Sequence, residues 1–451
     1  MTDRLSLTSA KNIIKHISTP HPINESTVAN YIGSDWYVIS TEAINVISLE
    51  SDGIVPKATV ESPVYKQAVL LTAKKLFKEA KKENKTKFVF SMHSEGFTYV
   101  DLKFYSDCFE YMKGFDGYEF AHAYGAHPHL LNKQYLRKHY ANLKLCEGIK
   151  ILLINHFELM MQGYLLGIIS DEAKKEFEQL NSIPTVKPYK FLLYNNYPKL
   201  NRTYLVGQLV HRNLESQGLI SLNLGHALGE GTRSRERQWE GAVINKMTDT
   251  ILNEYFPRTG KEIFNSMIEN KEKMISFKPL GTPRWELADD EYDSYCGLDA
   301  DGRDHVRSAY FGVTVETKYF HDRNTTLPSG TMMPNTLDTL YVDCITFTEK
   351  TYKFISGKIP FILVGMPKSL HVLRDSGYKT FQPYINEDYD NIEDDELRLV
   401  AIADEIERLC GLSDDEWLEI QRELIPRIEH NYQLLLKSEL SVLQLTVNRP
   451  N

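Results

Sequence analysis

The amino-acid sequence predicts an α/β fold, because strand-like and helix-like patterns alternate over most of the chain. Between the first two predicted strands lies an amphipathic helix, with Pro63 in its first turn and Val69, Ala73 and Ala80 on its apolar face. The first part of the chain is therefore expected to hold one sheet. Its strands are predicted at residues 36–40, 87–92, 118–123 and 150–156.

A second alternating series follows a proline-containing break at residues 181–188. The tail after this series is expected to be helical, because residues 394–409 are amphipathic and Ser413 with Glu416 forms a capping box. Pro426 is expected to kink the last helix. In the second series we expect strands at 191–195, 220–223, 309–316 and 360–365, and helices at 202–217, 236–255 and from Pro367.

These patterns divide the chain into three parts. We expect an N-terminal α/β domain over 1–185, a second α/β domain over 189–395 that binds the main ligand, and C-terminal helices over 396–451 that pack across the junction. Two Rossmann-like domains joined by a short linker would face each other across a cleft, which is the favoured place for a ligand.

The composition excludes several classes of protein. Of 451 residues, 42% are hydrophobic and 25% are charged, as in ordinary soluble globular proteins. The net charge of −9 argues against a broad basic face for nucleic acid, while leaving room for a local basic cleft. Five cysteines without Cys-x-x-Cys spacing argue against a zinc cluster or a disulfide framework. The start lacks a signal-peptide profile and no apolar run reaches membrane-spanning length, which predicts a cytoplasmic protein.

The most informative stretch is Thr346-Phe-Thr-Glu-Lys-Thr-Tyr-Lys-Phe354, ahead of the apolar segment Pro360-Phe-Ile-Leu-Val-Gly365. It sets Glu349, Lys350 and Lys353 at the start of a helix. A carboxylate there can bind ribose hydroxyls, while lysines and helix N–H groups neutralise phosphate. The simpler interpretation is a surface ion pair between Glu349 and Lys353, contributing about 0.3–0.5 kcal/mol. The strand that follows favours the functional interpretation, because it puts the helix start at a sheet edge.

Two further segments end predicted strands with polar residues. Asn195 ends the strand 191–195, and Arg202 follows in the first turn of the next helix, where it can share an anion with the helix N-terminus. The alternative is a helix capped by Asn201, with Arg202 solvated. Glu316 ends the strand 309–316, where it either receives a sugar or ribose hydroxyl or simply caps the next loop.

The order Val315-Glu-Thr317, Thr346-Phe-Thr-Glu-Lys-x-x-Lys353, Pro360-Phe-x-x-x-Gly365 resembles the donor half of family 10 fucosyltransferase-like glycosyltransferases, and also phage glycosyltransferases. The resemblance covers about 191–411 and implies the two-domain GT-B fold. It further implies that Glu349 binds the nucleotide ribose and that Lys350 or Lys353 binds the diphosphate.

The resemblance also implies a phosphate contact for Arg202, which follows the strand–Asn segment at Asn195. Thr317 stands where the family has Asn, and the stretch that follows is longer than the family spacing. The donor-binding residues predicted in this way are Arg202, Asn195, Glu316, Glu349, Lys350 and Lys353.

Inverting transfer needs a carboxylate that takes a proton from the attacking hydroxyl. Glu95, with His93 beside it, follows the strand 87–92, and the family has its base at a comparable strand end. The alternative is that both are ordinary loop residues. The histidine cluster from His122 to His129 is expected to line the acceptor cleft rather than to bind zinc. The stretch 299–304 is expected to be a turn, so no metal site and no resident cofactor are expected.

Together these features predict an inverting, metal-independent glycosyltransferase that moves a sugar from a nucleoside-diphosphate sugar to an acceptor hydroxyl. The acceptor is a glycan or small molecule or, alternatively, a hydroxymethylated base in DNA, as for phage-type DNA glycosyltransferases. In that case the enzyme would act in the host cytoplasm. A third interpretation is a non-catalytic binding or virion-associated protein with the same fold.

Overall fold

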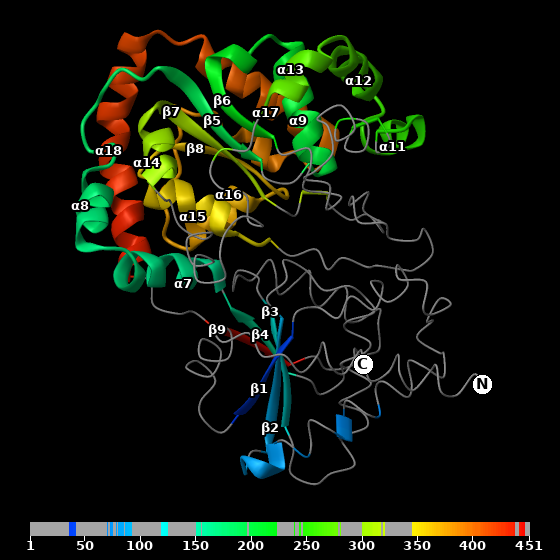
Figure 1. Cartoon of the computed structure of the whole chain (residues 1–451), viewed down its shortest axis with the longest axis vertical. Helices are drawn as coiled ribbons and strands as arrows, with labels where there is room; N and C mark the ends of the chain where they lie inside the picture. Colours follow the sequence, from blue (N-terminus) through cyan, green and yellow to red (C-terminus); the bar gives the residue numbers. More distant parts are fainter. Residues whose placement is uncertain are drawn as a thin grey trace.

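The two sheets predicted from the sequence are present in the computed structural model of the chain (Figure 1). The structure describes residues 36–41, 70, 73–74, 78, 80–84, 86–92, 119–124, 150–154, 156–195, 198–222, 239, 243–244, 247–277, 280, 300–316, 319–320, 345–437 and 442–446. Each sheet is built mainly from parallel strands, so the mixed α/β class is confirmed.

The first sheet contains the four strands expected in the N-terminal part, as parallel neighbours in chain order. They are β1 (Trp36–Thr41), β2 (Lys87–Met92), β3 (Glu119–Tyr124) and β4 (Lys150–Ile154). In the predicted helix between β1 and β2, Ala73 and Ala80 are fully buried, as the apolar face required.

A fifth strand of this sheet comes from the end of the chain. β9 (Val442–Thr446) pairs antiparallel with β4, with Val442 opposite Ile154 and Thr446 opposite Lys150. The prediction of a wholly helical tail is therefore wrong for these residues. A five-residue strand whose partner lies almost 300 positions earlier carries little local signal, because the pairing that stabilises it is non-local.

The second sheet has the order β6-β5-β7-β8, with all strands parallel. Every residue of β7 and β8 is buried, as expected for parallel strands covered on both faces. The strands are β5 (Tyr189–Asn195), β6 (Gly218–Leu222), β7 (Ala309–Val315) and β8 (Phe361–Val364).

The helices of this part cover both faces of the second sheet. The crossover from β5 to β6 leads towards one edge of the sheet, and the crossover from β7 to β8 leads towards the opposite edge. Right-handed crossovers then put α9 and α15 on opposite faces. α12 and α17 pack against α9, whereas α7 and α18 pack against α15. The helices are α7 (His156–Gly163), α8 (Asp171–Gln179), α9 (Leu200–His211), α11 (Asp249–Tyr255), α12 (Gly260–Glu269), α13 (Lys271–Ser276), α14 (Ala300–Arg307), α15 (Glu349–Ser356), α16 (Ser369–Asp375), α17 (Asp395–Cys410) and α18 (Asp414–Lys437).

Three predicted elements differ from the structure. The helix expected over 202–217 ends at His211, because Asn213 adopts a left-handed conformation with φ of 56°. The long helix expected over 236–255 is interrupted, since Thr248 is extended and its hydroxyl caps a new helix at Ile251 N–H. Residues 300–304 of the expected turn at 299–304 instead belong to α14, which covers 300–307.

The segment around α7 and α8 follows β4 in sequence but contacts the elements of the second sheet. Lys358 Nζ donates to Glu178 O at 2.6 Å, and Tyr378 Oη donates to Glu158 Oε1 at 2.5 Å. The division predicted near 185 stays a prediction, and these contacts favour a boundary directly after β4.

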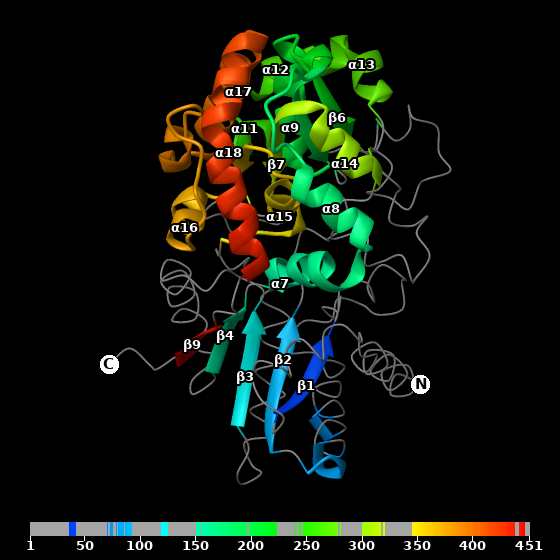
Figure 2. The ribbon, with the colours of Figure 1, turned by 90° about the vertical axis from the view of Figure 1, so that its left-hand side faces the viewer.

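α18 begins with the predicted capping box, in which Ser413 N–H and Oγ both donate to Glu416 Oε2. The helix is continuous through Pro426 and runs along the second sheet to α7 (Figure 2). Gln162 Nε2 of α7 donates to Leu436 O in its last turn at 3.0 Å. In the described part of the chain, no helix is both long and apolar enough to cross a membrane.

Candidate functional site at the carboxyl edge of the second sheet

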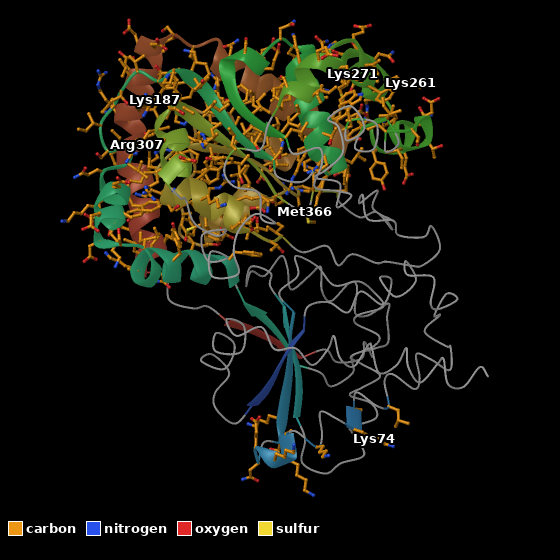
Figure 3. The ribbon with its side chains drawn as sticks, viewed as in Figure 1. Lys74, Lys187, Lys261, Lys271, Arg307 and Met366 are labelled. Carbon is orange, nitrogen blue, oxygen red and sulfur yellow. The ribbon has the colours of Figure 1, made fainter. Side chains whose placement is uncertain are left out.

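The order of the second sheet creates a topological switch point. The chain leaves β5 through α9 towards β6 and leaves β7 through α15 towards β8, so the two connections diverge from the centre of the sheet. Open α/β sheets bind ligands in the crevice that such divergence leaves at the carboxyl ends of the strands. Figure 3 shows Met366, which follows β8, on the side of this sheet turned towards the first sheet.

Asn195 is the last residue of β5 and lies at this switch point. The ring of Tyr194 stacks on Phe354 of α15, with centroids 6.0 Å apart, so Tyr194 points to the α15 face. Successive side chains of a strand point to opposite faces, and Asn195 therefore points to the α9 face. Its side chain is fully buried, and neither amide atom has a hydrogen-bond partner among the described residues.

Arg202 lies in the first turn of α9, and its side chain reaches from that helix to the end of β7. Its side chain is buried, and one Nη donates to Val315 O, the last residue of β7, at 3.1 Å. The alternative of a solvated arginine is therefore wrong, and so is a cap formed by Asn201, because Lys199 is the N-cap residue. The guanidinium instead brings positive charge to the end of a central strand.

Glu316 directly follows β7 and binds the start of α15. Its Oε1 accepts from Thr348 N–H at 3.0 Å and from Thr351 Oγ1 at 2.5 Å, and its Oε2 accepts from Thr348 Oγ1 at 2.6 Å. Burial raises the pKa of Glu316, while nearby Lys350 and these hydrogen bonds act in the opposite direction. Both carboxylate oxygens are thus engaged within the protein, and the role of Glu316 in binding a ligand hydroxyl stays a prediction.

The first turn of α15 carries Glu349 and Lys350. Glu349 is 4% exposed, and its Oε1 pairs with Lys350 Nζ at 2.7 Å. The same ammonium donates to Thr348 Oγ1 at 3.1 Å. Glu349 is therefore paired in a buried position beside the strand end, unlike the surface ion pair considered as an alternative. Lys353 lies one turn further along α15 and is half-buried.

Several buried polar atoms near this edge have no hydrogen-bond partner among the described residues. Besides the two amide atoms of Asn195, they include Asn201 Nδ2 and Thr203 Oγ1 of α9, Thr314 Oγ1 of β7, and Thr346 Oγ1 ahead of α15. Because an unmatched buried polar group costs about 1–3 kcal/mol, such atoms are typical of a site completed by ligand or water.

The structure thus brings five predicted donor-binding residues to one edge of one sheet, with Lys353 next along α15. The predicted base Glu95 and its neighbour His93 lie outside the described residues. So do His127 and His129, and of His122 only the strand backbone is described.

Comparison with known proteins adds no relative. No family model, no curated protein and no solved structure matches the chain. The resemblance to family 10 glycosyltransferases therefore rests on the sequence motifs alone.

The sequence analysis did not identify two residues at this edge, Thr348 and Arg398. Thr348 precedes α15 as an N-cap residue, a signal readable from the sequence, but its bond to Glu316 joins segments that are 32 positions apart. Arg398 of α17 is buried and donates to Gly365 O and Tyr319 O, which follow β8 and β7. No local pattern indicates that contact, because it depends on how α17 packs.

Among the described residues, no group of three or more His, Cys, Asp or Glu side chains is arranged to hold a metal ion. Besides the carboxylates of Glu316 and Glu349, which are engaged by Thr348, Thr351 and Lys350, the edge offers cations, amides and hydroxyls. The cations, amides and hydroxyls suit an anion that also carries hydroxyls.

Proposed function

We propose that the protein is a glycosyltransferase that binds a nucleoside-diphosphate sugar at the carboxyl edge of its second sheet. One observation carries the proposal: Arg202 and Lys350 bring positive charge from two helices to the two sides of the switch point. Buried polar atoms without a partner among the described residues lie beside them. A diphosphate carries the opposite charge, and its ribose and sugar supply hydroxyls.

In the proposed reaction an acceptor hydroxyl, deprotonated by Glu95, attacks the anomeric carbon of the donor sugar. The bond from that carbon to the diphosphate breaks, and the bonding electrons leave with the nucleoside diphosphate. Arg202, Lys350 and Lys353 would stabilise the negative charge that develops there, which is where fixed cations contribute most to catalysis. Glu349 would accept hydrogen bonds from the ribose.

The first experiment asks which nucleotide binds, by measuring thermal unfolding in the presence of UDP, GDP, CDP and ADP. A ligand at a hundred times its dissociation constant adds about 2.7 kcal/mol to the free energy of unfolding. We expect one base to stabilise the protein clearly more than the others. The matching sugar nucleotide should then release nucleoside diphosphate when it is incubated with the protein. Absence of stabilisation by every nucleotide, together with absence of release, would reject the proposal and favour a non-catalytic protein.

The role of Lys350 is tested by Lys350→Ala. Removing a cation that acts mainly in the transition state should lower turnover about 100-fold or more while the fold is retained. Lys261→Ala is the matched control, because that lysine is 65% exposed on α12, away from the switch point. Near-normal turnover of Lys350→Ala would remove this residue from the mechanism.

A further inference from the structure

The amino edge of the second sheet, opposite the candidate functional site, contains a small cavity. Its volume is about 10 Å³, close to the least room that a water molecule needs. The starts of β7 and β8, the segment 181–188 and one face of α18 surround it. Trp417, Leu424 and Ile428 of α18 give it apolar walls, and two lysines, Lys187 and Lys358, belong to the lining.

Lys358 is a fixed cation of this lining. Its Nζ donates to Glu178 O at 2.6 Å and lies 2.7 Å from a carboxylate oxygen of Glu429. It also lies 4.6 Å from the centre of the Tyr432 ring. These partners hold the ammonium in place, so Lys358 is not available as a nucleophile.

Lys187 is held differently. Its Nζ donates to Asn181 Oδ1 at 2.8 Å, and no carboxylate among the described residues forms an ion pair with it. The amide of Asn181 is itself oriented, because its Nδ2 donates to Gly357 O at 3.0 Å and to Val306 O at 3.3 Å. The Oδ1 atom therefore faces Lys187 as an acceptor. The charge that acts on this amine is that of Arg307, which is another cation (Figure 3).

This environment makes Lys187 a nucleophile. Burial, and secondarily the charge of Arg307, lowers its pKa to about 8, so about half of the amine is neutral at pH 8. The neutral amine donates one N–H to Asn181 Oδ1 and keeps a lone pair that can attack an electrophile. The side chain is only half-buried, so small molecules reach it from solvent. Lys190 lies three positions further on and differs, because Asp414 pairs with it at 3.0 Å.

The size and polarity of the cavity favour one class of electrophile. An aldehyde of a sugar or an acyl thioester carries too many atoms for a cavity of about 10 Å³. Carbon dioxide has three atoms and no net dipole, so it suits a small space with apolar walls. Its adduct with an amine is an anion. The positive charge of Arg307, which disfavours the ammonium of Lys187, favours that product.

We propose that Lys187 reacts reversibly with carbon dioxide to form a carbamate at the mouth of this cavity. A bond forms between Nζ and the carbon, one electron pair of a C=O bond moves to its oxygen, and an amine proton leaves to water. The carbamate keeps one N–H, which can still donate to Asn181 Oδ1. The reaction creates an anion that attracts Arg307, and so links the segment 181–188 to α14. It does not rest on the proposed function, which concerns the carboxyl edge.

The adduct is tested by chemical trapping in the unaltered full-length protein. The protein is equilibrated at pH 8 with bicarbonate and carbon dioxide, and triethyloxonium then converts any carbamate into its stable ethyl ester. Peptide mass spectrometry should find the ester on Lys187 and not on Lys190 or on Lys261, which is 65% exposed. Absence of the ester from Lys187, or equal labelling of Lys261, would overturn the inference.

Variants test the residue and its electrostatic surroundings. With carbon-13-labelled bicarbonate, we expect an NMR resonance of a carbamate that Lys187→Arg removes, because a guanidinium forms no carbamate, and that Lys261→Arg retains. Arg307→Gln should lower the amount of ester on Lys187 about threefold or more at pH 8, because it removes the positive charge that favours the anion. Arg307 is 41% exposed, so its replacement should leave the fold intact, which circular dichroism verifies. An unchanged amount of ester in Arg307→Gln would contradict the inference.

The two proposals fail in different ways. Ester on Lys187 without release of nucleoside diphosphate from any sugar nucleotide would reject the glycosyltransferase and retain the carbamate. Turnover of a sugar nucleotide without ester on Lys187 would do the reverse.

Discussion

Glu316 and Thr348 are joined by two hydrogen bonds that fasten the end of β7 to the start of α15. The backbone N–H of Thr348 donates to Oε1 at 3.0 Å, and its hydroxyl donates to Oε2 at 2.6 Å. Thr351 adds a third donor to the same carboxylate. Since α15 carries Glu349 and Lys350, this contact fixes where those side chains stand relative to the sheet.

Replacing Glu316 with alanine should therefore destabilise the protein. Glu316→Ala leaves three buried donors without an acceptor, and we expect a loss of about 3 kcal/mol in the free energy of unfolding. Glu316→Gln keeps one acceptor oxygen and the side-chain shape, so its loss should be below about 1 kcal/mol. Urea unfolding of both variants measures the difference. Equal losses would mean that the hydrogen bonds to Thr348 and Thr351 contribute little.

The same carboxylate should make stability depend on pH. Burial raises the pKa of Glu316 above the ordinary value of 4.5, so the folded protein binds this proton more readily than the unfolded chain does. Its contribution to stability is then greatest at low pH and declines as pH rises from 4.5 through the raised pKa. We expect the stability of the wild type relative to Glu316→Gln to decrease over that window. A difference that increases with pH would contradict the raised pKa.

Lys187 should produce the opposite pH dependence at the other edge of the sheet. Burial, and secondarily the charge of Arg307, lowers the pKa of Lys187 to about 8 (both residues are labelled in Figure 3). The unfolded chain therefore binds this proton more tightly than the folded protein between about pH 8 and 10.5, and stability rises with pH there.

Lys187→Met should remove this rise and increase stability at pH 7. Allowing for partial exposure and for loss of the bond to Asn181 Oδ1, we expect a gain of about 1–2 kcal/mol. Denaturant unfolding between pH 7 and 10.5 measures it, with the exposed Lys261→Met as control. A destabilised variant with an unchanged pH profile would refute the prediction.

Gly312 should tolerate no side chain, because α15 packs directly on it. A Cβ added at Gly312 would lie 2.4 Å from the ring of Phe354, which is closer than real Cβ contacts allow. Gly312→Ala should cost about 1–3 kcal/mol through overpacking. The double variant Gly312→Ala with Phe354→Leu should recover part of that loss. A double-mutant cycle by urea unfolding measures the coupling, and additive losses would show that the two positions do not interact.

Pairing with β9, the strand near the end of the chain, should be needed for the stability of β4. Truncation after Lys437 removes β9 and exposes the β4 edge, whereas truncation after Thr446 retains all five paired positions. We expect amides of 150–154 to exchange faster only in the shorter protein, and that protein to aggregate more readily through the exposed edge. Equal exchange in the two truncated proteins would show that β9 contributes no protection.

Much of the second sheet could be predicted from the sequence. The apolar runs of β5, β7 and β8 are visible locally, since strands buried on both faces read as continuous hydrophobic segments. The cationic and polar residues next to the strand ends were identified from their positions relative to these apolar runs. The capping box at Ser413 is also a local signal.

Other features depend on contacts between distant parts of the chain. The tail was expected to be helical throughout, and β9 forms because β4 offers an unpaired edge. The helix break at Thr248 and the helix α14 likewise differ from what the local sequence pattern predicted, namely one long helix and a turn. Local propensity is weak compared with the free energy of burial and pairing, so these elements follow from the assembled sheet.

The sequence by itself determined the α/β class and the identity of the polar residues at the strand ends, because periodicity and residue type are local properties. Only the tertiary structure decided that Glu316 accepts hydrogen bonds from the start of α15, whereas the start of α9 lacks a side-chain cap among the described residues. The reason is physical: whether a charged group is satisfied depends on which partners the fold brings within hydrogen-bonding distance, and those partners lie far away in the chain.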